Sequence, residues 1–167
     1  MSRDALGTLA VIVGARLKGA GEVLVTAESC TGGWVGQAVT AVAGSSEWFD
    51  RGFVTYSNAA KQEMLGVSAA TLERHGAVSE ETAGEMASGA LARSGGTIAV
   101  SITGVAGPGG GSAAKPVGLV CFGWATKGGV VVESRRFDGD RDSVRRQAVL
   151  RALQGVIERL DDAAAQV

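Results

Sequence analysis

The chain has 167 residues, 46% of them hydrophobic and 20% charged, a composition ordinary for a globular protein and long enough for one sizeable core. We therefore expect residues 1–167 to form a single domain. The formal net charge of −1 excludes nucleic-acid binding through a general positive field.

The cysteine and histidine content excludes two further classes of protein. Two cysteines, Cys30 and Cys121, do not make a disulfide framework, and with one histidine the chain has no zinc-ligand pattern. No apolar run reaches the ~20 residues that span a bilayer, and we read no signal peptide at the N-terminus. We expect a cytoplasmic protein with reduced thiols, no metal or other cofactor, and no membrane or nucleic-acid partner.

Hydrophobic periodicity and turn residues divide the first half of the chain into alternating helices and strands. Serines at positions 57 and 68 are suited to cap the two short helices that follow them. The expected elements are a helix over Ala5–Lys18, a strand over Val23–Thr26, a helix over Val35–Val42, a strand over Arg51–Tyr56, and short helices over Ala59–Leu65 and Ala69–Arg74.

In the second half of the chain, another helix and strand are followed by a β-hairpin. The expected elements are a helix over Glu80–Arg93, strands over Thr97–Thr103, Val117–Ala125 and Val130–Phe137, and a last helix over Ser143–Leu160. The polar turn between the last two strands indicates antiparallel pairing there. Alternation followed by a hairpin predicts an α/β fold, a three-layer α/β/α sandwich with a mixed, mainly parallel sheet.

The stretch from Thr26 to Trp34 is the first candidate for an active centre. It joins an apolar strand to a helix, contains the hydroxyl of Ser29 and the thiol of Cys30, and has two glycines that allow close backbone approach. The first amides of a helix are unpaired and carry partial positive charge, so residues 31–33 are suited to form an oxyanion hole for a serine nucleophile. The alternative interpretation is a plain helix N-cap. Cys30 is a rival nucleophile, but the one histidine, His75, lies in a polar turn that indicates a surface position.

An amide hydrolase built on Ser29 without a histidine needs another base. Lys61, in the first turn of a short helix, can serve if burial lowers its pKa, and Tyr56, at the end of the preceding strand, can relay a proton. Taken alone, this pattern favours a non-catalytic interpretation, in which Tyr56 is an aromatic residue at a strand end and Lys61 is a solvated helix lysine.

Two further segments carry possible anion ligands. The glycine-rich loop from Gly104 to Ser112 follows a buried strand, and its amides can hold a phosphate or a carboxylate. It lacks the Gly-Lys-Ser/Thr ending of an ATP-binding P-loop, and a long surface loop is the alternative. Arg141, Arg145 and Arg146 lie near the start of the last helix, where positive charge opposes the helix dipole. That placement indicates that one of them binds an anion. The alternative interpretation is that they form a solvated charged face.

Together these segments resemble one family, the C-terminal domain of the competence/damage-inducible protein CinA, whose stand-alone members are bacterial nicotinamide-nucleotide amidohydrolases. The resemblance covers nearly the whole chain. At Gly109, where some relatives carry an acid, the chain departs from them in a way that affects the loop rather than the chemistry. The motifs that carry the resemblance occur in the family's order: Thr26–Gly33, Gly44–Ser46, Gly52–Asn58 with Lys61, His75–Ser79, Ser101–Pro108, Lys115–Gly118 and Gly139–Arg145.

The resemblance implies hydrolysis of the carboxamide of nicotinamide mononucleotide to nicotinate mononucleotide and ammonia, in the bacterial pyridine nucleotide cycle. It carries over Ser29 as the nucleophile and Lys61 with Tyr56 as the base and proton relay. The expected substrate-binding residues lie in the turns after the buried strands and in the last helix, with Glu28 orienting its turn. They are Glu28, Thr31, Gly32, Gly33, Thr103, Gly104, Gly107 and Arg145.

Two other functions stay open at this point. The chain can be a non-catalytic partner domain in competence or damage response, although a scaffold has no need of Ser29, Tyr56 and Lys61. It can also be an amidase for a different pyridine amide. We expect a homo-oligomer, for which the exposed face of the first helix is available.

Overall fold

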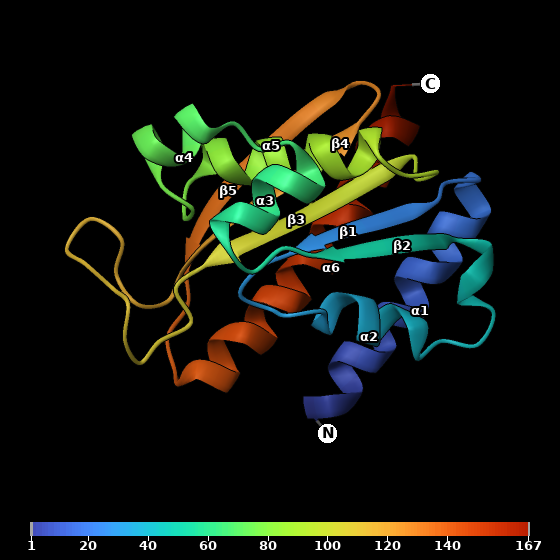
Figure 1. Cartoon of the computed structure of the whole chain (residues 1–167). Coiled ribbons are helices and arrows are strands. Elements are labelled where there is room, and N and C mark those ends of the chain that lie inside the picture. The colour runs from blue at the N-terminus through green and yellow to red at the C-terminus, as the bar shows by residue number, and fades with distance from the viewer. Residues whose placement is uncertain (1, 167) are drawn as a thin grey trace.

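The computed structural model describes residues 2–166, with side chains described from residue 5 onward. The expected helices and strands are present, and their ends differ from the predicted ones by a few residues (Figure 1). The helices are α1 (Ser2–Ala20), α2 (Trp34–Thr40), α3 (Asn58–Leu65), α4 (Ala69–His75), α5 (Glu80–Ala92) and α6 (Arg141–Ala165), with a 3₁₀ turn, η1 (Ser45–Glu47). The strands are β1 (Leu24–Glu28), β2 (Phe49–Val54), β3 (Ile98–Gly104), β4 (Leu119–Thr126) and β5 (Gly129–Arg136).

The described strands form one five-stranded sheet in the order β2-β1-β3-β4-β5. Strand β1 pairs in parallel with β2 and β3, whereas β4 pairs antiparallel with β3 and β5. All the strands except β4 therefore run in one direction. The prediction of a mixed, mainly parallel sheet that ends in a hairpin is confirmed.

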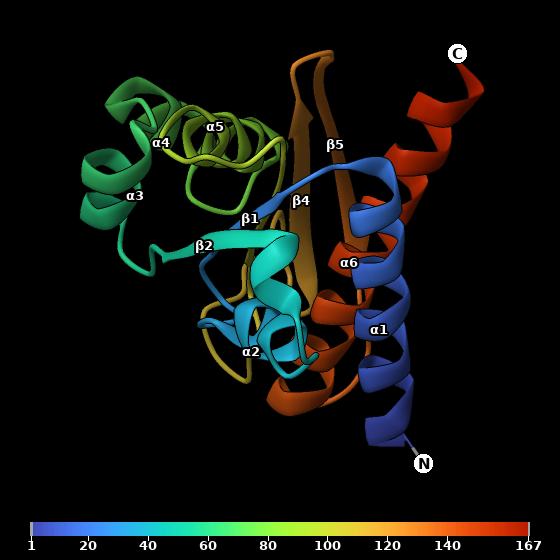
Figure 2. The same cartoon turned by 90° about the vertical axis from the view of Figure 1, so that its right-hand side faces the viewer.

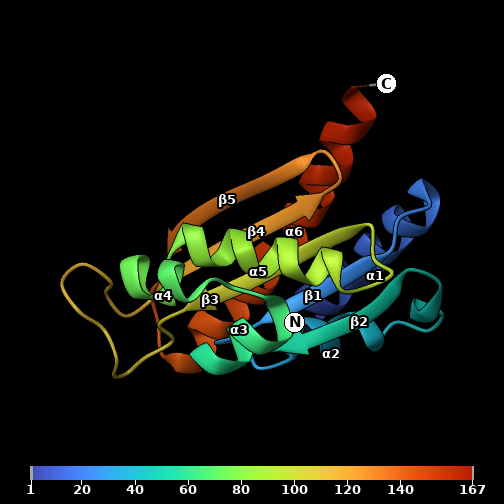
Figure 3. The same cartoon turned by 45° about the horizontal axis from the view of Figure 1, so that its top comes forward.

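Helices cover both faces of the sheet, which gives the predicted three layers. Helices α1, α2 and α6 lie on one face, and α3, α4 and α5 on the other (Figure 2). Viewed onto the second face, α5 lies along the middle of the sheet (Figure 3). Among residues 2–166, no helix combines the length and apolar character that a membrane crossing requires.

Each face of the sheet has its own hydrophobic core. On the α1/α2/α6 face, Phe122 stacks on Trp124, and the indole nitrogen of Trp124 donates to the carbonyl of Ala152 on α6 at 3.0 Å. The core under α5 contains smaller side chains, among them Ala87 and Ala90. Small residues let α5 approach the sheet closely.

The chain leaves the sheet on opposite faces after β1 and after β2. From β1 it passes through α2 on one face to β2, and from β2 it passes through α3, α4 and α5 on the other face to β3. In open α/β sheets a crevice forms where neighbouring strands send their connections to opposite faces. The carboxyl ends of β1, β2 and β3 meet at that place, and each is followed by a segment that contains candidate site residues.

Candidate active site

The turn after β1 presents Ser29 at the carboxyl edge of the sheet. Ser29 directly follows the last residue of the strand, and its amide donates to the carbonyl of Ile102 on β3 at 2.9 Å. The turn then closes through two left-handed residues, Gly32 (φ 59°) and Gly33 (φ 103°). A side chain at either position would be strained, so the glycines are what allow so tight a passage from strand to helix.

Glu28, the last residue of β1, binds the start of α2 with both carboxylate oxygens. Its Oε1 accepts from the hydroxyl of Thr31 at 2.6 Å and from the amides of Gly33 at 3.2 Å and Val35 at 3.0 Å. Its Oε2 accepts from the amide of Gly36 at 3.1 Å. The side chain is 2% exposed, so these bonds replace its hydration. The helix N-terminus that was expected to attract a substrate anion is therefore occupied by the protein's own carboxylate, and Glu28 orients the turn rather than lining the cleft.

Arg145 holds the opposite side of the same turn. Its guanidinium donates from Nε to the carbonyl of Cys30 at 3.0 Å and from Nη2 to the carbonyl of Thr31 at 3.1 Å. The guanidinium also lies over the ring of Trp34, 5.4 Å from its centroid. Arg145 was expected to contact substrate, and in the structure its charge is directed at the turn.

The amides available for an oxyanion overlap with the predicted residues 31–33 only at Thr31. The amide of Gly32 donates to the carbonyl of Ser29 at 3.0 Å, and that of Gly33 donates to Glu28, so neither is free. The amides of Cys30 and Thr31 donate to no other residue within 2–166. Sequence reasoning missed this shift because it depends on where the carboxylate of Glu28 lies.

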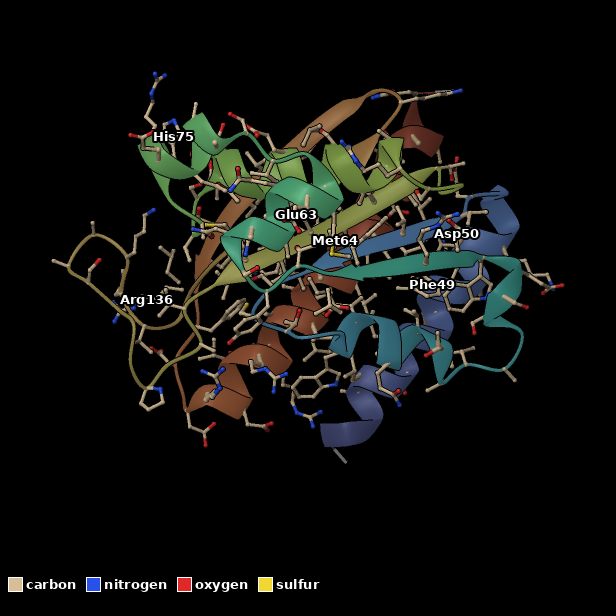
Figure 4. The ribbon with its side chains drawn as sticks, in the orientation of Figure 1. Phe49, Asp50, Glu63, Met64, His75 and Arg136 are labelled. Carbon is tan, nitrogen blue, oxygen red and sulfur yellow. The ribbon has the colours of Figure 1, made fainter. Side chains whose placement is uncertain are left out.

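Lys61 lies on the inward face of α3, close to Ser29. Its side chain is 1% exposed, and Leu65, one turn later, is buried beside it. Glu63 and Met64 lie on the outward side of the same helix (Figure 4). The Nζ atom of Lys61 is 3.0 Å from the Oγ atom of Ser29. Of the two interpretations of Lys61, the solvated helix lysine is wrong.

The surroundings of Lys61 lower its pKa and give its nitrogen three acceptors. Nζ donates to the carbonyls of Thr55 at 3.0 Å and Tyr56 at 3.1 Å. As an ammonium, Nζ also donates its third N–H to Ser29 Oγ. As a neutral amine it keeps two N–H groups for the carbonyls and has a lone pair that can take the hydroxyl proton of Ser29. Burial lowers the pKa of Lys61 from its ordinary value of 10.5. The pair can therefore exchange one proton at the nucleophile.

Tyr56 contributes its backbone, rather than its phenol, to this pair. Its carbonyl accepts from Lys61 and, more weakly, from the Oγ of Ser29 at 3.4 Å. Its side chain is 62% exposed, and its hydroxyl accepts from Nη2 of Arg141 at 3.3 Å. Within the described residues no hydrogen bond joins this hydroxyl to Ser29 or Lys61, so the structure does not bring the expected proton relay together.

The rival nucleophile Cys30 is inert in this setting. Its side chain is buried, and burial raises the pKa of the thiol to about 12, so it is protonated at neutral pH. His75 lies at the outer end of α4 (Figure 4), where its Nδ1 is 3.7 Å from a carboxylate oxygen of Glu81. The surface position expected for His75 is confirmed, and no Cys–His pair forms.

A cleft of about 270 Å³ opens at the carboxyl ends of the parallel strands. Of the predicted binding residues, Gly104 and Gly107 line it, whereas the hydroxyl of Thr103 is turned away and donates to the carbonyl of Ala77 at 2.8 Å. Arg141 lines the cleft in the place that was expected for Arg145. The lining residues are Cys30, Tyr56, Val78, Gly104, Val105, Ala106, Gly107, Gly109, Gly110 and Arg141.

A second hollow, of about 360 Å³, lies between α5 and β5. It is larger than the cleft, but its polar lining consists of Glu80, Glu81, Glu85 and Ser88, with no lysine or histidine among the lining residues. In the described part of the chain, no three His, Cys, Asp or Glu side chains are grouped to hold a metal ion. Ser29 and Lys61 do not line the smaller cleft themselves, but Cys30, next to Ser29, and Tyr56, whose carbonyl contacts both, do. This adjacency makes the smaller cleft the candidate active site.

Known proteins share this fold and sequence. A family model described as the CinA C-terminal domain matches residues 6–160. The chain is 57% identical over 155 residues to the "Nicotinamide-nucleotide amidohydrolase PncC" of Enterobacter agglomerans, a match that covers 92% of this chain and 94% of that protein. It is 56% identical, with the same coverage, to the protein of the same name from Escherichia coli K12. The crystal structure of "competence/damage inducible protein CihA" from Agrobacterium tumefaciens superposes with a TM-score of 0.90 at 47% identity, covering 94% of this chain and 96% of that one.

Proposed function

Because the chain belongs to the CinA C-terminal domain family, we propose that it hydrolyses the carboxamide of nicotinamide mononucleotide to nicotinate mononucleotide and ammonia. Two relatives that carry the amidohydrolase name match it over nearly their whole length at 56–57% identity. The single observation that carries the proposal is the 3.0 Å contact between Ser29 Oγ and a fully buried lysine nitrogen. An amide hydrolase needs such an activated hydroxyl, and a scaffold domain does not.

The first step joins Ser29 to the carboxamide carbon. The lone pair of Lys61 takes the hydroxyl proton while Oγ attacks the carbon, and the carboxamide oxygen becomes an oxyanion. The amides of Cys30 and Thr31 lie beside the nucleophile and donate to no other residue within 2–166, and they stabilise this charge. Arg145 and Glu28 fix the turn from its two sides, which keeps both amides in place during the reaction.

The second step releases ammonia and the third restores the enzyme. The oxyanion collapses, the C–N bond breaks, and the protonated Lys61 gives its proton to the leaving nitrogen, so that ammonia departs and an ester on Ser29 remains. Lys61 then takes a proton from water as that water attacks the ester. Return of the proton to Oγ releases nicotinate mononucleotide. One water is consumed and one ammonia is formed, and Lys61 alone carries the proton in both directions.

An ammonia-release assay on a panel of nicotinamide, nicotinamide riboside and nicotinamide mononucleotide tests the proposal. We expect the mononucleotide to be the best substrate and its product to be nicotinate mononucleotide by mass. Lys61→Met should lower kcat by about 10²–10⁴-fold, the usual contribution of a general base. Lys127→Met, at an exposed turn, is the matched control and should leave the rate unchanged. Ammonia from none of the three compounds would favour a non-catalytic domain, and preference for another amide would change the substrate.

A further inference from the structure

Arg141 is a cation in the cleft, and its contacts within the described residues are with neutral groups. It is exposed, it is the first residue of α6, and it is the charged side chain among the cleft-lining residues. Its Nη1 donates to the carbonyl of Gly107 at 2.7 Å and its Nη2 to the hydroxyl of Tyr56 at 3.3 Å. Both partners are neutral, and among the side chains described from residue 5 onward no carboxylate oxygen lies within the 4.0 Å of an ion pair with it.

Three other cations near this end of the fold are directed at the protein, and Arg136, at the end of β5 (Figure 4), does not line the cleft. Arg145 donates to the carbonyls of the nucleophile turn, and Arg146 lies over Trp34 at 5.1 Å from the ring centroid. Lys115 donates from Nζ to the carbonyl of His75. Arg141 is thus the cation that remains for a ligand in the cleft.

Tyr56 sets the spacing between Arg141 and the reacting pair. Its carbonyl contacts Lys61 and Ser29, whereas its hydroxyl, at the other end of the side chain, contacts Arg141. Roughly one tyrosine side chain therefore separates the nucleophile from the guanidinium. In a pyridine mononucleotide the carboxamide and the phosphate lie at opposite ends of the molecule, so one ligand can reach both groups.

The guanidinium is held in place and still has donors to spare. An arginine has five N–H groups, and the two bonds described above use two of them. The remaining three can bind a phosphate in the forked geometry that arginine favours. The amides of Gly109 and Gly110, in the same lining, donate to no acceptor within residues 2–166 and offer neutral donors beside it.

We propose that Arg141 is the receptor for the 5′-phosphate of the nucleotide and thereby determines the preference for a phosphorylated substrate over its nucleoside. This inference rests on the proposed function for the identity of the amide. It assigns to Arg141 a role in binding the end of the substrate that does not react. The effect of replacing Arg141 on kcat/KM should therefore depend on whether the substrate has a phosphate.

The kinetic test compares nicotinamide mononucleotide with nicotinamide riboside in the wild type, Arg141→Ala and Arg141→Gln. Glutamine retains a neutral donor for the carbonyl of Gly107, so it preserves the loop if alanine perturbs the fold. Both variants should lower kcat/KM for the mononucleotide by about 10- to 100-fold, mainly through KM, because a hydrogen-bonded charge contributes on that scale. The value for the riboside should change less than about twofold. Lys127→Ala removes the same charge at the β4–β5 turn, at the opposite end of the sheet, and should alter neither substrate.

A binding test separates this inference from the amidase proposal. Ribose 5-phosphate has the phosphate and the sugar but no amide, and its affinity for the wild type and Arg141→Gln can be measured by calorimetry. We expect binding to the wild type and a loss of about 10-fold or more in the variant, whether or not any amide is hydrolysed. Equal affinity for both proteins, no binding to the wild type, or equal kinetic losses for mononucleotide and riboside would overturn the assignment of Arg141.

Discussion

Replacing Glu28 with glutamine tests whether one buried carboxylate holds the catalytic turn. Glutamine has nearly the same shape, and its oxygen can retain the three bonds that Oε1 now accepts. Its NH₂ group, however, would face the amide of Gly36, which now donates to Oε2 at 3.1 Å. One hydrogen bond to a charged group is lost, worth about 1.5–3 kcal/mol, together with a negative charge at the N-terminus of α2, worth about 0.3–1 kcal/mol.

The expected loss of stability for Glu28→Gln is thus about 2–4 kcal/mol. With an m-value of about 2 kcal/mol/M, typical of urea unfolding, the midpoint should fall by roughly 1–2 M without a change in m. Glu63→Gln is the matched control, because Glu63 lies on the outward side of α3, and it should stay within about 0.5 kcal/mol of the wild type.

The same substitution should reduce kcat more than it changes KM. The turn presents both Ser29 and the amides proposed for the oxyanion, and a displacement of about 1 Å in a reacting group can cost about 10²-fold. If Glu28→Gln unfolded at the wild-type urea concentration and kept its kcat, the carboxylate would not be what holds this turn.

Three further predictions follow from the packing and the charges. Since burial lowers the pKa of Lys61 from 10.5 and the base must be neutral, kcat/KM should rise with pH along a limb centred below 10.5, and a limb centred at or above that value would exclude Lys61. A Cβ on Gly89 would overlap the carbonyl of Leu65, so Gly89→Ala should displace α3, cost about 1–3 kcal/mol in chemical unfolding and lower kcat; wild-type values for both would contradict this packing. Hydrogen bonds from Arg151 hold the pKa of Glu158 below 4.5, so their contribution to stability is present above pH 4.5 and is lost as the pH falls through the folded-state pKa of Glu158. Arg151→Met should therefore lose less stability than the wild type when the free energy of unfolding is measured from neutral pH to below 4.5. Parallel stability–pH curves for the two proteins would refute this.

Periodicity and capping residues predict much of this fold because they act over a few neighbouring residues. The side chains of Ser57, Ser68 and Ser79 each accept from the amide three positions later, as helix caps do. Strand ends were harder to predict. Strand β1 continues to Glu28, two residues beyond its expected end, because its last residues are fully covered by helices on both faces and need no alternation.

The candidate site was predictable in its residues but less so in their contacts. The approach of Ser29 to Lys61 depends on where α3 packs, and a buried lysine has no local signature apart from its place one turn before Leu65. Arg141 and Arg145 share one face of α6, and the sequence does not distinguish which of them meets the turn and which meets the cleft. Tyr56 was expected to act through its phenol, and the structure brings its backbone carbonyl to the pair instead.

The proposed chemistry rests on Ser29, and the rate of ammonia release from nicotinamide mononucleotide by Ser29→Ala tests it most directly. Cys30→Ala is the matched control, since it removes the neighbouring reactive atom from the same turn. We predict that Ser29→Ala loses at least about 10³-fold in kcat, as other hydrolases do without their nucleophile, while Cys30→Ala keeps most of its activity. A Ser29→Ala protein that released ammonia at the wild-type rate would contradict the account.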